Sequence, residues 1–84
     1  MINLSEDTEF MSLLNDVFHT DKYDYQIKQI PIGNYYEIRF RHQPSNSPLC
    51  IGKCDCTEEE AIRGIKEIMN GYRNVKHWKN WEFD

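Results

Sequence analysis

The sequence has few of the residues that cross-link or interrupt a chain, with three cysteines, three prolines and four glycines among 84 residues. The cysteines are odd in number and close together, at Cys50, Cys54 and Cys56. Small secreted domains usually carry even sets of cysteines that join distant segments. The start of the chain lacks the basic and apolar segments of a secretion signal, and no apolar run approaches the roughly 18 residues of a membrane span. We therefore expect reduced thiols, a cytoplasmic location and no membrane partner.

Motifs for catalysis are also missing. The chain has no G-x-S-x-G sequence, no glycine loop that would hold a phosphate and no paired metal motif. The three cysteines share one parity on an expected strand, whereas a zinc site brings four ligands together around one ion. We expect no enzyme activity, no cofactor and no metal, and keep a small thiol or zinc protein as an alternative.

Basic residues are absent from the first quarter of the chain. Residues 1–21 contain five acidic side chains and no lysine or arginine, in a chain with a formal net charge of −4. Residues 22–56 carry a net positive charge. Such an uneven distribution of charge gives information about binding partners and solubility, and none about the fold.

The composition that is present fits one folded domain. Hydrophobic residues make up 39% of the chain and aromatic residues 13%, which is more than a disordered segment usually contains. A chain of this length can build one core. We expect residues 1–84 to form a single domain.

Two amphipathic helices are expected, at 6–19 and 58–70. Ser5 can cap the first helix, and Thr57 and Glu60 have the spacing of a capping box for the second, which Asn70 and Gly71 would end. Both segments repeat apolar residues at helical spacing. The apolar stripe of the first helix consists of Phe10, Leu13, Leu14, Val17 and Phe18.

Three strands are expected between these helices, because apolar residues there alternate with polar ones. The first runs from Tyr23 to Pro31, the second covers 35–41, and the third covers 49–56 after a loop at 43–48. Ile32, Gly33 and Asn34 would form the first turn. The predicted fold is α+β with the order α-β-β-β-α, a three-stranded antiparallel sheet and both helices on one face.

The open face of this sheet is expected to carry an apolar patch. Alternation places Tyr36, Ile38 and Phe40 toward the helices, and the same reasoning places the three cysteines inside. Tyr35, Leu49 and Ile51 would then form the patch. We expect the aromatic tail, residues 72–84 with Trp78, Trp81 and Phe83, or a second copy of the chain, to cover it.

Two sets of charged residues are candidate binding sites. The first is acidic and lies on the expected helices: Glu6, Asp7, Glu9, Asp16, Glu58, Glu59 and Glu60. The second is basic and aromatic and lies on the expected sheet face: Lys28, Tyr35, Arg39, Arg41 and Lys53. The acidic set would suit a protein with a basic surface, and the second set would suit nucleic acid. A sequence pI of about 5.3 makes nucleic acid the less favoured partner.

The order of elements is similar to that of double-stranded RNA-binding domains. The second helix of those domains opens with a lysine cluster, whereas this one opens with Thr57 and three glutamates. In its small size, acidic character and element order, the chain resembles phage-encoded anti-CRISPR and related anti-defence proteins. That resemblance implies a non-catalytic inhibitor that occupies the basic groove of a nucleic-acid-binding protein.

Overall fold

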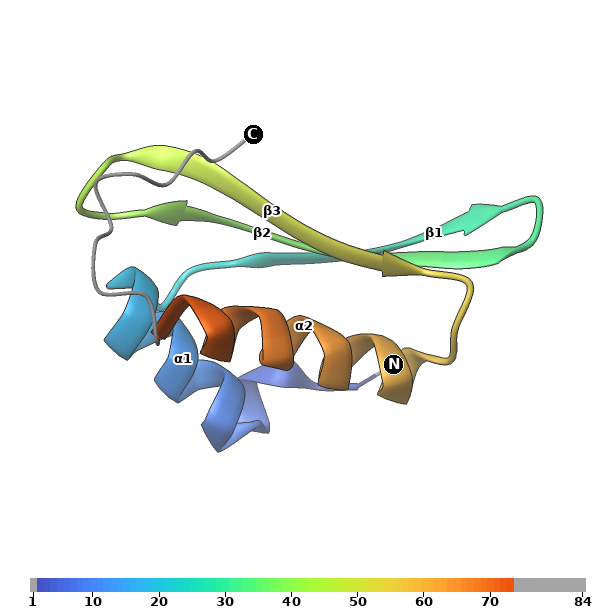
Figure 1. Cartoon of the computed structure of the whole chain (residues 1–84), viewed down its shortest axis with the longest axis horizontal. Coiled ribbons are helices and arrows are strands. Elements are labelled where there is room, and N and C mark those ends of the chain that lie inside the picture. The colour runs from blue at the N-terminus through green and yellow to red at the C-terminus, as the bar shows by residue number, and fades with distance from the viewer. Residues whose placement is uncertain (1, 74–84) are drawn as a thin grey trace.

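The chain folds into two layers, a three-stranded sheet and a pair of helices below it (Figure 1). The structure is a computed structural model, and it describes residues 2–73. The elements follow in the order η1 (Leu4–Glu6), α1 (Thr8–Phe18), β1 (Asp24–Ile30), β2 (Gly33–His42), β3 (Ser47–Cys54) and α2 (Glu58–Arg73). The predicted α-β-β-β-α architecture is confirmed. The tail beyond residue 73 lies outside the described residues.

Helix α1 begins later than Ser5, the predicted cap. A short 3-10 turn occupies Leu4–Glu6, and Asp7 caps α1 by accepting a hydrogen bond from the backbone N–H of Phe10 at 3.1 Å. The extra turn forms because Asn3 caps it first, accepting from the backbone N–H of Ser5. His19 ends α1 in the left-handed conformation.

The sheet is an antiparallel meander with β2 in the centre. Ile30 pairs with Gly33, so the first turn consists of Pro31 and Ile32 and not of the predicted Ile32, Gly33 and Asn34. Proline fixes the φ angle that such a turn requires, and it needs no N–H partner there. The β1–β2 hairpin extends past the end of the helical layer (Figure 1).

The predicted faces of β3 are wrong. Leu49 pairs with Phe40 and Ile51 pairs with Ile38, so both lie on the helix side, where each is 4% exposed. Cys50 and Cys54 are exposed instead, and Cys56 is partly buried beyond the end of the strand. Cross-strand partners share one face of a sheet, and the larger apolar side chains gain more from burial than the thiols do.

The core lies between the layers and contains Phe10, Phe18, Ile38 and Ile65, each fully buried. Helix α2 continues three residues beyond its predicted end, because Tyr72 packs edge-on against Phe18 with ring centroids 5.3 Å apart. This burial outweighs the poor helix propensity of glycine. None of the helices within residues 2–73 is long and apolar enough to cross a membrane.

Candidate interaction surfaces

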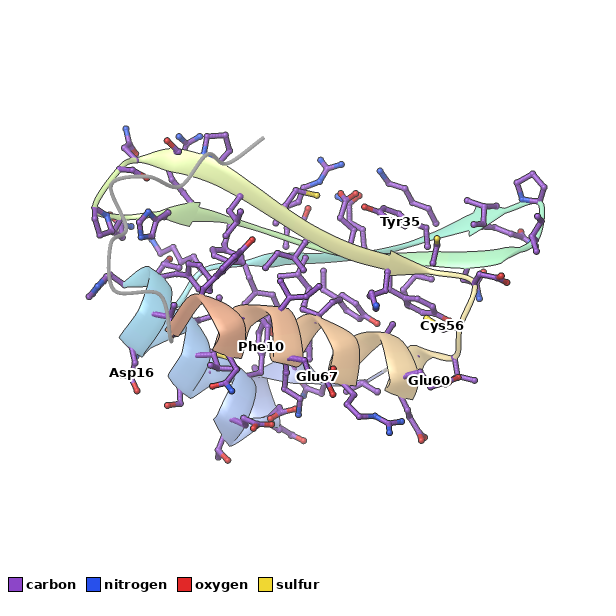
Figure 2. The ribbon with its side chains drawn as sticks, viewed as in Figure 1. Phe10, Asp16, Tyr35, Cys56, Glu60 and Glu67 are labelled. Atoms are coloured by element: carbon purple, nitrogen blue, oxygen red, sulfur yellow. The ribbon has the colours of Figure 1, made fainter. Side chains whose placement is uncertain are left out.

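The outer side of the helical layer is acidic. Residues 4–18 and 58–73 together hold eight carboxylates and three basic side chains, whereas the strands hold two carboxylates and four basic side chains. Asp16, Glu60 and Glu67 point away from the sheet (Figure 2). The two helices therefore present several of their carboxylates to solvent on one side of the molecule.

Asp7 and Glu9 share one cation from the other helix. The ammonium group of Lys66 lies 2.9 Å from a carboxylate oxygen of Asp7 and 3.1 Å from one of Glu9. Burial raises the pKa of Asp7, but the hydrogen bonds from Lys66 and the Phe10 N–H outweigh it and hold the pKa below its ordinary value. Asp7 therefore joins the two helices, while the Glu9 side chain stays 70% exposed.

Two predicted acidic residues of α2 also have partners within the fold. Glu58 accepts hydrogen bonds from the Tyr25 hydroxyl at 2.6 Å and from the Ile2 N–H at 3.1 Å. The bond from Tyr25 is the main cause of the lowered pKa of Glu58. Glu60 accepts from the N–H and the hydroxyl of Thr57, which confirms the predicted capping box. Of the predicted acidic set, Glu6, Glu9, Asp16, Glu59 and Glu60 are exposed, whereas Asp7 and Glu58 are partly buried.

A groove of about 440 Å³ lies between residues 2–9 and helix α2 on this acidic side. Ile2 and Ile62 supply its apolar part, and its charged lining residues are four carboxylates and two basic side chains. Its lining comprises Ile2, Asp7, Glu9, Glu59, Ile62, Arg63, Lys66, Glu67 and Asn70. The groove is a feature of the acidic surface that the sequence did not predict, because its walls come from segments at least 50 residues apart.

The open face of the sheet is centred on a buried carboxylate. Glu37 is 5% exposed, although it lies on the face without helices, and it forms ion pairs with Arg39 and with Lys28, the latter at 3.9 Å. Burial raises the pKa of Glu37, but the hydrogen bonds from Arg39 and Cys50 and the charges of Arg39 and Lys28 hold it below its ordinary value. Glu37 thus neutralises part of the predicted basic face.

Tyr35 lies across β3 at Gly52 and covers this carboxylate. A Cβ atom added to Gly52 would fall within 2.7 Å of the Tyr35 ring, so only glycine leaves room for the ring there. Burial, with the nearby Cys50 and Glu37, raises the pKa of Tyr35. Tyr35 is partly buried, and its ring lies against Gly52 on the open face.

The remaining basic candidates are divided between faces. Arg41 lies on the open face and donates to the backbone oxygen of Asn46 at 2.6 Å. Lys53 pairs with Tyr36 and reaches over Gly64 of α2, so it belongs to the helix side. The predicted patch of Tyr35, Leu49 and Ile51 does not form, because Leu49 and Ile51 lie on the helix side.

The thiols do not form a metal site in the part of the chain that the structure describes. Residues 2–73 contain no cluster of three or more Cys, His, Asp or Glu side chains that could hold an ion. Cys54 and Cys56 line a shallow groove with Lys53 and Arg63, whereas Cys50 lies beside Glu37. Partial desolvation of the thiol and the neighbouring Glu37 carboxylate raise the pKa of Cys50, which disfavours the reactive thiolate.

The fold and these surfaces define a two-layer α+β protein with an acidic helical side. Comparison with protein-family models, with curated proteins and with solved structures gave no match to this chain.

Proposed function

We propose that this chain is a small non-catalytic binding protein that engages a basic protein surface through the outer side of its helices. The observation that carries the proposal is the division of charge between the layers, with most carboxylates on the helical side. Complementary charge steers association and selects partners. In keeping with the resemblance of the sequence, the partner we propose is a nucleic-acid-binding protein, inhibited when its basic groove is occupied.

Four exposed carboxylates, Glu6, Glu9, Asp16 and Glu59, form the proposed contact surface. Asp7 and Glu58 are assigned to the fold because they are partly buried and accept hydrogen bonds, and Glu60 because it completes the capping box of α2. Asp16 accepts a hydrogen bond from Ser12 and Glu9 pairs with Lys66, but both side chains remain exposed. Glu67 joins the surface, since it points away from the sheet beside the groove between the helices (Figure 2).

The open sheet face is the alternative surface, and nucleic acid is the partner it would suit. Lys28, Arg39 and Arg41 supply charge there, but Glu37 forms ion pairs with two of them. Phosphate binding depends on uncompensated positive charge, and this face has less of it than the sequence suggested. The acidic side is therefore the better-supported contact surface.

The test is capture of the partner from lysate of the source cell, followed by titration of the purified pair. The variant Glu6→Gln with Glu59→Gln neutralises two exposed carboxylates of the helical side. A matched control, Asp21→Asn with Asp55→Asn, neutralises two exposed carboxylates outside the helices. We expect the helical variant to bind about tenfold more weakly and the control to bind like the wild type.

Equal binding by both variants would overturn the proposed surface. A gel-shift titration with duplex RNA and DNA at low salt tests the alternative, and a complex that Arg41→Gln weakens would establish it instead. Added salt should weaken the protein complex, because exposed charges are screened.

A further inference from the structure

The outer edge of β1 is an unpaired backbone edge close to exposed apolar side chains. Within residues 2–73, β2 is the only strand that pairs with β1. Ile27 is 37% exposed and Ile32, at the hairpin turn, is 79% exposed. Edge strands of this kind invite another strand unless the sequence protects them.

The other edge of the sheet is protected. β3 contains Pro48, which cannot donate a backbone hydrogen bond, and Lys53, and α2 packs beneath it. β1 contains no proline within Asp24–Ile30. Its two charged residues are Asp24 and Lys28, four positions apart.

The charges of β1 are complementary to those of a second β1 strand. Asp24, Gln26 and Lys28 lie on the open face, because their partners in β2 are Arg39, Glu37 and Tyr35. If two copies of β1 pair antiparallel about Gln26, then Asp24 of each copy stands opposite Lys28 of the other. Opposite charges directly across an antiparallel pair are stabilising.

The helix side of the strand is complementary in the same register. Tyr25 and Ile27 lie on that side, opposite Ile38 and Tyr36 of β2. Pairing about Gln26 places Ile27 of one copy beside Tyr25 of the other. There it meets a groove of about 280 Å³, lined by Ile2, Asn3, Leu4, Tyr23 and Tyr25.

We propose that a second copy of this chain binds the β1 edge, in antiparallel register about Gln26, and joins the two sheets into one. A two-fold axis between antiparallel edge strands runs perpendicular to the sheet. Both helical layers then lie on the same side of the joined sheet. The dimer presents two acidic surfaces side by side, but its formation does not depend on the function proposed above.

Charge exchange tests this register. Asp24→Lys places two lysines of each copy opposite two of the other, and Lys28→Asp places aspartates opposite aspartates. Each variant alone should dimerise at least about tenfold more weakly than the wild type. An equimolar mixture of the two variants restores both opposite-charge pairs, and should recover a heterodimer in sedimentation-velocity experiments on the full chain.

Three results would overturn the proposal. The first is a wild-type chain that stays monomeric at a protein concentration of about 1 mM. The others are variants that dimerise like the wild type, and a mixture of the two variants that remains monomeric. Hydrogen exchange of the wild type keeps the test valid if a variant fails to fold. Amides of β1 should become more protected as protein concentration rises, whereas amides of β3 should not change. Binding of the captured partner is measured separately, so failure of the dimer leaves the acidic surface testable.

Discussion

At the scale of single residues, several carboxylates of the helical layer stabilise the fold through contacts with other groups of the protein. Asp7 caps α1, binds Lys66 of α2 and lies at the junction of the two helices. Its side chain is 22% exposed and that of Lys66 is 21% exposed, so solvent screens the pair less than it screens a surface pair. The Asp7–Lys66 contact therefore contributes to the orientation of the helices.

Replacement of Lys66 tests this contact. Lys66→Met keeps the aliphatic stem but removes the ammonium group, and we expect a loss of about 1 kcal/mol in the free energy of unfolding at pH 7. The lowered pKa of Asp7 makes the stabilisation present at neutral pH and lost as pH falls through the folded pKa. Urea unfolding at pH 7 and pH 3 should thus show a smaller difference between wild type and variant in acid.

Glu9→Gln is the control, because it leaves the pair of Asp7 and Lys66 intact. A control that loses as much stability as Lys66→Met would show that Glu9, and not Asp7, carries the interaction.

At the scale of elements, two glycines have opposite roles. Gly52 in β3 leaves room for the Tyr35 ring, which covers Glu37 on the open face. Gly71 lies in α2, and a Cβ atom there would meet nothing within 4 Å. One glycine is required by packing and the other only lowers the stability of a helix.

The same substitution at both positions should therefore change stability in opposite directions. Gly52→Ala displaces the Tyr35 ring and should destabilise the protein by about 1–3 kcal/mol. Gly71→Ala should stabilise it by about 0.5–1 kcal/mol. Thermal unfolding followed by circular dichroism measures both, and a neutral Gly52→Ala would contradict the packing role of that glycine.

The sequence predicted the elements well because each has a strong local signal. Helical spacing and the capping box of Thr57 located α2, and alternation located the strands. The faces of β3 could not be read from alternation, because Leu49, Ile51 and the cysteines are all apolar by composition and only the register with Phe40 and Ile38 decides between them. Glu37 was missed as the centre of the open face, since its burial depends on Lys28 and Arg39 from two strands.

At the scale of the whole molecule, the two layers have different electrostatic roles. The helical side keeps exposed carboxylates, whereas the charges of the sheet face are largely paired with one another around Glu37. Aromatic contacts join the two layers at one end of the molecule. The ring centroid of Phe18 lies 4.6 Å from that of Phe40 and 6.0 Å from that of His42. That junction contains the buried group whose titration should control stability near neutral pH.

His42 is 4% exposed, and its Nδ1 lies 2.8 Å from the Ser45 hydroxyl. Burial, and then the charge of His19, lower the pKa of His42 below its ordinary value of 6.5. The unfolded chain therefore binds a proton at His42 more readily than the folded protein does. The free energy of unfolding keeps its full value above the ordinary pKa of histidine and declines as pH falls from about 7 toward 5.5. The carboxylates with lowered pKa values, including those of Glu37 and Glu58, lose their contribution only at lower pH.

We expect the urea midpoint of the wild type to fall between pH 7.5 and pH 5.5, and that of His42→Asn to change less over the same range. Asparagine can keep a polar contact with Ser45 but does not titrate. His19→Asn is the matched control, since its side chain is exposed and it should keep most of the pH dependence. If the urea midpoint changes equally with pH in the wild type and in His42→Asn, the pH dependence of stability arises from groups other than His42.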